Sequence, residues 1–257
     1  MSELHHEVAG PAGGHVVLLG GSLGATFAIW DAQVGPLAER FRVVRFDHRG
    51  HGGSPAPPGP YSVADLGGDV LALLDALGVE RASYCGISLG GMIGIWLAEH
   101  APERIERLAL LCTSAHVPPP EAWAERAAAV EEAGSADVVA DAVVARWLTP
   151  ELARERPDLV DWLRGMIAGT SPVAYTGCCG AIERMDLREG LSGIAAPTLV
   201  VAAAQDPSIP PDHGEALAAA IPDARFELLS PSAHLAVIER ADDVTRLLLE
   251  HLGPAAG

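Results

Sequence analysis

The sequence has no long hydrophobic run. No stretch of about 18 or more apolar, uncharged residues occurs in the chain, so we expect no membrane-spanning helix. The first residues, MSELHHEVAGPAGG, lack the basic start and the apolar segment that a secretory signal peptide needs. We therefore expect a cytoplasmic protein.

Cysteine is also scarce. The chain has four cysteines, Cys85, Cys112, Cys178 and Cys179, and their spacing matches neither a metal site nor a disulfide framework. Few cysteines without such a pattern are typical of a reducing, cytoplasmic compartment. We expect no metal ion and no other cofactor.

Positive charge is the third deficit. The chain has 17 Lys and Arg residues against 34 Asp and Glu residues, which gives a formal net charge of −17. Such a field repels phosphate backbones and anionic lipids, so nucleic acid and membranes are poor partners. A small anionic substrate would need an arginine in the pocket to overcome the same field. We expect a small-molecule partner, and the sequence leaves association into a homo-oligomer open.

Hydrophobic residues make up 49% of the chain and form short runs that are typical of buried parallel strands. These runs are 15–21, 41–47, 81–87, 104–112, 197–204 and 224–230. Helical patterns lie between most of them: 62–78 begins with Ser62 as a cap, 88–101 ends before Pro102, and 241–252 closes the fold. This alternation predicts an α/β fold with a mostly parallel central sheet and helices on both faces.

The alternation of strands and helices stops between about residues 117 and 190. This stretch is rich in Ala, Glu, Arg and Trp, has no strand-like run, and is longer than one crossover connection needs. We interpret it as an inserted helical cap, or lid. The predicted organisation is a core of residues 1–116 and 191–257 with a cap of residues 117–190. A pair of ordinary crossover helices is the alternative.

The segment YCGISLGGM, residues 84–92, places Ser88 in the pattern G-x-S-x-G. A predicted strand precedes Ser88 and a predicted helix follows it, which is the context of a nucleophile elbow. The serine backbone at such a turn is strained, and side chains two residues away on either side would collide. Gly86 and Gly90 are therefore required. A glycine-rich turn that merely carries a serine is the plainer alternative.

A serine hydroxyl is a poor nucleophile and needs a base. Among ten histidines we favour His234, because it lies between the last predicted strand and the last predicted helix. A loop at that position ends at the sheet edge where α/β folds bind ligands. His48 and His51, in the segment DHRGHGGS, are expected to hydrogen-bond their own loop instead.

The base in turn needs an acid to orient it. Asp206 directly follows a predicted strand and lies between the serine and the histidine in chain order, which is the order found in folds with a nucleophile elbow. It would hold the ring of His234 in the correct tautomer and stabilise the imidazolium. The alternative for Asp206 is a capping or turn role before Pro207. Asp212 is the nearest competitor, but it suits a helix cap better.

Two backbone N–H groups are expected to stabilise the negative charge that develops on the substrate oxygen. One belongs to Leu89, which follows the serine at the start of a helix, where the helix dipole assists. The other comes from the loop GGSLGATFAIW, in which we favour Leu23 over Ser22. The glycines of this loop let the backbone approach a substrate closely. The loop lacks the G-x-G-x-x-G pattern, so no dinucleotide is expected.

Taken together, these segments make the chain similar to the α/β-hydrolases over nearly its whole length. The resemblance is carried by GGSLGATFAIWDAQ, FDHRGHGGS, the elbow, AQDPSIPP and SAHLAVIE. Within that superfamily the chain most resembles the 3-oxoadipate enol-lactonases, through SLG (22–24), MIGIWLA (92–98), ARWLTPEL (145–152) and YTGCCGAIERMDL (175–187). Gly20 and Gly21 depart from this pattern, because these lactonases often carry polar residues there.

The resemblance implies hydrolysis of a small enol-lactone with a free carboxylate, giving 3-oxoadipate in the β-ketoadipate pathway of aromatic catabolism. Ser88 would attack the ring carbonyl while His234 takes its proton, and activated water would then release the acid from the acyl-enzyme. For the substrate carboxylate we favour Arg146 beside Trp147, and the resemblance supports this choice, with Arg184 as the weaker candidate. A surface helix arginine next to a core tryptophan is the alternative.

Other functions stay open on the same residues. A general carboxylesterase or a C–C bond hydrolase would use the same fold and the same triad. A non-catalytic, ligand-sensing α/β-hydrolase would have a decayed site, and the intact Ser88, Asp206 and His234 argue against it. A haloalkane dehalogenase is disfavoured because it would need a carboxylate in place of the serine.

Overall fold

The computed structural model describes residues 4–253, so the extreme ends of the predicted core, residues 1–3 and 254–257, lie outside it. A seven-stranded sheet runs through the centre in the order β1-β3-β2-β4-β5-β6-β7. The strands are β1 (His6–Ala9), β2 (Val16–Gly20), β3 (Arg42–Phe46), β4 (Ala82–Ile87), β5 (Ile105–Leu111), β6 (Thr198–Ala203) and β7 (Ala224–Leu229). Only β1 runs antiparallel to its neighbour, so the predicted α/β fold with a mostly parallel sheet is confirmed.

The burial of the strands explains why most of them could be predicted from the sequence. Every residue of β2, β4 and β6 is buried, because helices cover both faces of the sheet and such strands read as continuous apolar runs. The first strand, β1, lies at the edge and is partly exposed, so its polar sequence HEVA carries no comparable signal.

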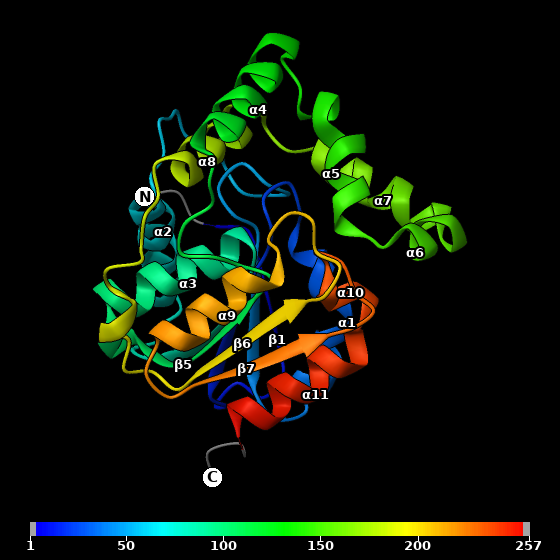
Figure 1. Cartoon of the computed structure of the whole chain (residues 1–257). Helices are drawn as coiled ribbons and strands as arrows, with labels where there is room; N and C mark the ends of the chain where they lie inside the picture. The colour runs from blue at the N-terminus through cyan, green and yellow to red at the C-terminus, as the bar shows by residue number, and fades with distance from the viewer. Residues whose placement is uncertain (1–3, 254–257) are drawn as a thin grey trace.

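Helices lie on both faces of this sheet (Figure 1). Helices α1 (Asp31–Ala38) and α11 (Ala241–Leu252) pack against each other on one face, beside the short α10 (Ala236–Glu239). Helices α2 (Val63–Ala76), α3 (Leu89–His100) and α9 (Pro211–Ala220) cover the other. Ser62 begins α2 as predicted, because its hydroxyl accepts the Asp65 N–H and the Asp65 carboxylate accepts the Ser62 N–H. Between residues 4 and 253, none of the helices has the length and apolar character needed to cross a bilayer.

The proposed cap contains five helices between β5 and β6. They are α4 (Pro120–Ala133), α5 (Ala140–Trp147), α6 (Pro150–Glu155), α7 (Pro157–Ala168) and α8 (Pro172–Glu183). Helix α4 packs along α8, and α5 packs against α7. In Figure 1 these helices stand above one end of the sheet, apart from the helices that cover its faces. This arrangement supports the division into core and cap, which stays a proposal.

Close backbone contact fixes where α3 begins over the sheet. A Cβ atom added to Gly90 would lie 2.4 Å from the carbonyl oxygen of Gly20, and one added to Gly86 would lie 2.3 Å from the carbonyl carbon of Gly90. Both neighbours are backbone, which cannot rotate away as a side chain can. Glycine is therefore required at both positions for the helix to approach β2 and β4.

We expect Gly90→Ala to destabilise the protein by about 3 kcal/mol, the upper end for overpacking, because backbone must move to admit the methyl group. In a domain of this size this lowers the thermal unfolding midpoint by roughly 6–12 °C. Gly68→Ala, within α2 and with no atom within 4 Å of the added Cβ, is the matched control. It should leave the midpoint unchanged or raise it. Equal midpoints for the two variants would contradict the contact argument.

Candidate active site

Ser88 lies between the end of β4 and the start of α3 in a backbone conformation that favours glycine. Its φ of 56° and ψ of −118° fall in a region that L-residues rarely adopt. The surrounding backbone holds it there: the Ser88 N–H donates to the Leu111 carbonyl at 2.9 Å, and the Ser88 carbonyl accepts from the Thr113 hydroxyl at 2.7 Å. Strain of this kind persists only where neighbouring structure enforces it, and it is concentrated at functional sites.

His234 and Asp206 are in direct contact, as the sequence predicted for base and acid. The Nδ1 atom of His234 lies 2.7 Å from Oδ2 of Asp206, and the two side chains are 3% and 0% exposed. The other carboxylate oxygen accepts the N–H groups of Ser208 at 2.8 Å and Ile209 at 3.1 Å. A carboxylate accepts a hydrogen bond, so the ring proton of His234 is on Nδ1 and Nε2 carries the lone pair that a general base needs.

Ser88 and His234 line the same cavity, which has a volume of ≈ 160 Å³. Among the described residues the serine hydroxyl forms no hydrogen bond to the histidine ring, and catalytic hydrogen bonds of this kind often tighten only when substrate binds. The cavity is smaller than the roughly 300–1,000 Å³ typical for drug-sized ligands. It therefore suits a small substrate.

The backbone around the expected oxyanion hole has free donors. Within residues 4–253 the N–H groups of Leu23 and Leu89 donate to no backbone carbonyl, while that of Gly90 donates to Gly21. The Leu89 N–H belongs to the first residue of α3, where a helix leaves its donors without internal partners. Leu23 and its alternative Ser22 both line the cavity, and the Ser22 N–H is equally free. The preference for Leu23 stays a prediction.

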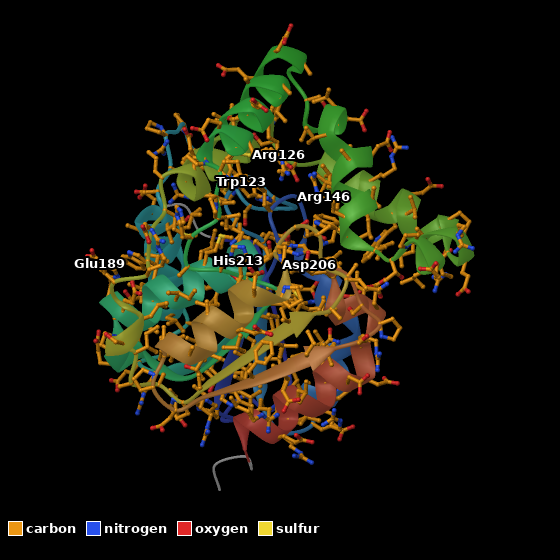
Figure 2. All side chains as sticks on the ribbon, in the orientation of Figure 1. Trp123, Arg126, Arg146, Glu189, Asp206 and His213 are labelled. Atoms are coloured by element: carbon orange, nitrogen blue, oxygen red, sulfur yellow. The ribbon has the colours of Figure 1, made fainter. Side chains whose placement is uncertain are left out.

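The cap contributes two arginines to this cavity. Arg146 and Trp147, the residues expected to hold a carboxylate, both line it from α5. Arg126 and Trp123 line it from α4, with the Arg126 guanidinium 4.6 Å from the centre of the Trp123 ring. Figure 2 shows Trp123, Arg126 and Arg146 together where the cap faces the sheet.

Arg184, the weaker candidate, lies elsewhere. It follows the end of α8, and its guanidinium donates to the Tyr61 carbonyl at 2.7 Å. It lines a different cavity, between α4 and α8, and is absent from the lining of the cavity that holds Ser88. The structure therefore brings Arg146 to the candidate site and leaves Arg184 outside it.

The charges around the two arginines of the cavity bear on what the cavity can bind. In the part of the chain that the structure describes, neither Arg126 nor Arg146 has a carboxylate oxygen within 4.0 Å, although most other arginines do. Burial lowers the pKa of Arg146, and the positive charge of Arg126 lowers it further. Two neighbouring cations without a counter-ion favour the binding of an anion between or beside them.

Sequence reasoning missed Trp123 and Arg126. They are three residues apart on α4, which places both side chains on one face of the helix. The spacing W-x-x-R was a usable signal, but nothing in the sequence shows that this face, rather than another, points to the core. Between residues 4 and 253 no group of three or more His, Cys, Asp or Glu side chains is arranged to hold a metal ion. All four cysteines are free and buried.

The family assignment agrees with this geometry. The sequence model of the α/β hydrolase fold matches residues 14–241. The chain therefore belongs to the α/β hydrolase family, which confirms the resemblance inferred from the sequence. Together with relatives named as enol-lactonases, the family identifies the chain as an enzyme.

Individual relatives have names that are narrower than the name of the family. The chain is 36% identical to 3-oxoadipate enol-lactonase 2 of Acinetobacter baylyi over 92% of this chain and 88% of that protein. It is 34% identical to a protein of Variovorax paradoxus provisionally named carbamate hydrolase RutD, over 97% of this chain and 96% of that protein. The crystal structure of the enol-lactonase from Burkholderia xenovorans matches with a TM-score of 0.95 at 39% identity, over 98% of this chain and 96% of that one.

Two substitutions of Ser88 separate its chemistry from its backbone strain. We expect Ser88→Ala and Ser88→Gly both to lower kcat by roughly 10⁴-fold or more, because each removes the expected nucleophile. Ser88→Gly should be about 1 kcal/mol more stable than Ser88→Ala, because only glycine relieves the strained φ. Turnover assays and thermal unfolding measure the two effects. Substantial activity in either variant would exclude Ser88 as the nucleophile.

Proposed function

We propose that this enzyme hydrolyses a carboxylic ester bond in a small enol-lactone that carries a free carboxylate, giving 3-oxoadipate in aromatic catabolism. Ser88 is the nucleophile, His234 the base and Asp206 the residue that orients the base. The observation that carries the substrate class is the pair of arginines, Arg146 and Arg126, that line the cavity beside Ser88 and His234 and have no acidic partner among residues 4–253. The relatives named as 3-oxoadipate enol-lactonases support the same class.

The proposed reaction begins when Nε2 of His234 takes the proton of the Ser88 hydroxyl as its oxygen attacks the ring carbonyl. The N–H groups of Leu89 and Leu23 stabilise the oxyanion of the tetrahedral intermediate. Breaking the ring C–O bond releases an enol that stays tethered to the acyl-enzyme, and the imidazolium returns its proton to that oxygen. Water activated by His234 then attacks the ester and frees the acid from Ser88.

The charge of the whole molecule explains why the cap must supply arginines. A formal net charge of −17 opposes the approach of a carboxylate from solution. A guanidinium in a partly buried cavity, shielded by Trp147 and Trp123, binds a carboxylate through two parallel hydrogen bonds. The bound anion also relieves the repulsion between the two arginines.

A second candidate is hydrolysis of a carbamate. The 34% identity to the RutD protein covers nearly the whole of both chains, so the comparison favours this alternative over other chemistry of the fold. The same triad and oxyanion hole would act on a carbamate carbonyl. A general carboxylesterase and a C–C bond hydrolase also stay open, because they require no change in the triad.

A panel of substrates tests the proposal. Purified protein is mixed with the enol-lactone, and the loss of its ultraviolet absorbance is followed beside a neutral lactone, a p-nitrophenyl ester, a carbamate and a ring-fission diketone. We expect the highest kcat/KM for the carboxylate-bearing enol-lactone. A higher kcat/KM for the carbamate or for the neutral substrates would contradict the proposed substrate class.

Arg146→Ala should raise KM for the anionic enol-lactone by roughly 10–100-fold, because a charge-assisted hydrogen bond contributes about 1.5–3 kcal/mol. Turnover of a neutral p-nitrophenyl ester should change less than about threefold. Arg184→Ala is the matched control, since it removes an arginine of the cap that lines a different cavity. An equal loss on anionic and neutral substrates would argue against a carboxylate-binding role for Arg146.

A further inference from the structure

The loop that carries Leu23 is held by side chains from one other segment, residues 47–51. The Nε2 atom of His48 donates to the Gly21 carbonyl at 2.9 Å. The Gly24 N–H donates to Nε2 of His51 at 2.9 Å. The anchoring points therefore lie two residues before and one residue after Leu23, on either side of the expected oxyanion donor.

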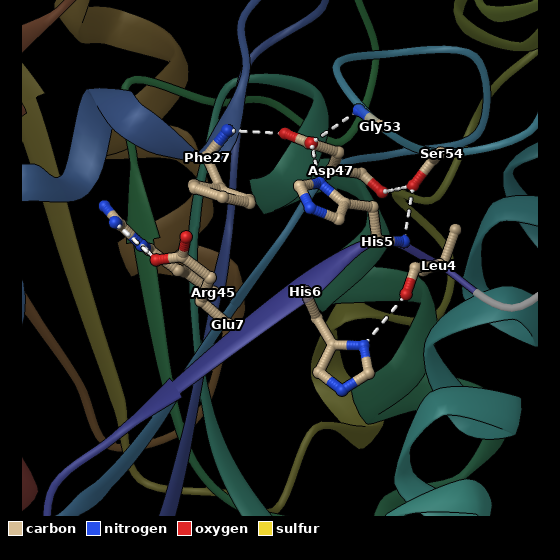
Figure 3. A network of polar contacts seen from close by, with 9 residues as sticks. All are labelled: Leu4, His5, His6, Glu7, Phe27, Arg45, Asp47, Gly53 and Ser54. Atoms are coloured by element: carbon tan, nitrogen blue, oxygen red, sulfur yellow. Dashed lines mark hydrogen bonds and ion pairs between the residues drawn. The ribbon is translucent and has the colours of Figure 1, made fainter.

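Asp47 fixes the next part of the same loop. Its carboxylate accepts the Phe27 N–H at 2.7 Å and the Gly53 N–H at 3.0 Å, and it lies 2.7 Å from Nδ1 of His5 (Figure 3). The Ser54 hydroxyl donates to the Asp47 carbonyl at 2.7 Å, which ties both ends of the 47–54 turn together. The segment that anchors the loop is thus itself held by several hydrogen bonds.

The hydrogen bonds of His51 define its tautomer. Its Nε2 accepts a backbone N–H, so the ring proton is on Nδ1, which donates to the Arg49 carbonyl at 3.1 Å. Burial, assisted by the neighbouring His48, lowers the pKa of His51 to about 4. The ring therefore keeps its lone pair on Nε2 throughout the neutral range.

His51 has no access to substrate. Its side chain is 0% exposed, and it is not among the residues that line the cavity of Ser88. Gly24, the residue that it binds, has a φ of +85°, and the N–H of Gly24 and that of Leu23 are adjacent donors along one turn of backbone. The Leu23 N–H belongs to the peptide that joins Ser22 to Leu23, and the peptides on its two sides are held by His48 through the Gly21 carbonyl and by His51 through the Gly24 N–H. Loss of the Gly24 hydrogen bond therefore allows the peptide after Leu23 to rotate and the Leu23 N–H to change direction with it.

We propose that His51 is a positioning residue of the oxyanion hole, which aims the Leu23 N–H at the substrate oxygen by holding the Gly24 N–H. The proposal rests on the proposed function in one respect, the assignment of Leu23 as an oxyanion donor. It depends on no particular substrate. His48 supports the other side of the same loop through Gly21, whose carbonyl also accepts the Gly90 N–H at 2.9 Å beside the elbow.

A pair of substitutions tests the role of the Nε2 lone pair. In His51→Gln the side-chain oxygen reaches the place of Nε2 and still accepts the Gly24 N–H. In His51→Asn the shorter amide reaches only the place of Nδ1, so the Arg49 contact remains and the Gly24 acceptor is lost. We expect His51→Asn to lower kcat for a p-nitrophenyl ester by roughly 10–100-fold with KM nearly unchanged, which is less than the loss of a whole oxyanion donor. His51→Gln should recover most of kcat.

Binding of a trifluoromethyl ketone distinguishes a misplaced oxyanion donor from a general loss of protein stability. This inhibitor adds to the serine and forms a tetrahedral oxyanion, so its Ki should rise in His51→Asn by the same factor as kcat/KM falls. His100→Asn, an exposed histidine at the end of α3, is the control and should behave as the wild type. An unchanged kcat in His51→Asn, a loss confined to KM, or a glutamine variant as impaired as the asparagine variant would overturn the proposal.

Two further measurements cover the cases in which a variant does not fold or the proposed substrate does not react. If the asparagine variant does not fold, ¹⁵N NMR of the wild-type His51 ring decides, because a protonated Nε2 overturns the proposal and an unprotonated one supports it. If the wild type hydrolyses the p-nitrophenyl ester but does not open the enol-lactone, the proposed substrate fails while the role of His51 is still measured on the ester.

Discussion

The positive φ of Ser88 is the constraint on which the rest of the site depends. A strand and a helix can meet at this residue only if the helix begins very close to the sheet, and that approach excludes a side chain at Gly86 and Gly90. The N–H of Gly90 then donates to Gly21. The strained turn is therefore connected directly to the loop that carries Leu23, so a backbone hydrogen bond links the proposed nucleophile to the expected oxyanion donors.

The expected catalytic groups and the expected substrate-binding groups come from different parts of the fold. The proposed triad and the expected oxyanion hole come from strand ends, a helix start and hydrogen-bonded loops, all of which have few ways to move. Arg146 and Arg126 come from separate helices that stand above the sheet end and meet over the cavity. The core thus supplies the proposed chemistry and the cap supplies the proposed recognition of charge, which is needed because the chain as a whole is strongly acidic.

Local patterns account for what the sequence predicted well. Buried parallel strands give continuous apolar runs, so the sheet could be predicted. The glycines around Ser88 mark a sterically demanding turn, so the elbow could be predicted as well. The contact between His234 and Asp206 could be predicted because strand ends converge at one sheet edge, and their catalytic roles stay predictions. Arg126 was missed and Arg184 was considered because no comparable rule states which face of a cap helix meets the core. His51 was expected to bond its own loop, and it does so through Arg49, but its bond to Gly24 depends on tertiary packing.

The most direct test of the central claim is peptide mapping of the protein after reaction with a fluorophosphonate, which forms a stable adduct with an activated serine. We expect a single labelled peptide with the adduct on Ser88. Labelling should slow strongly in His234→Ala, because no base then takes the hydroxyl proton. Labelling of another residue, or a rate that does not depend on His234, would contradict the central claim.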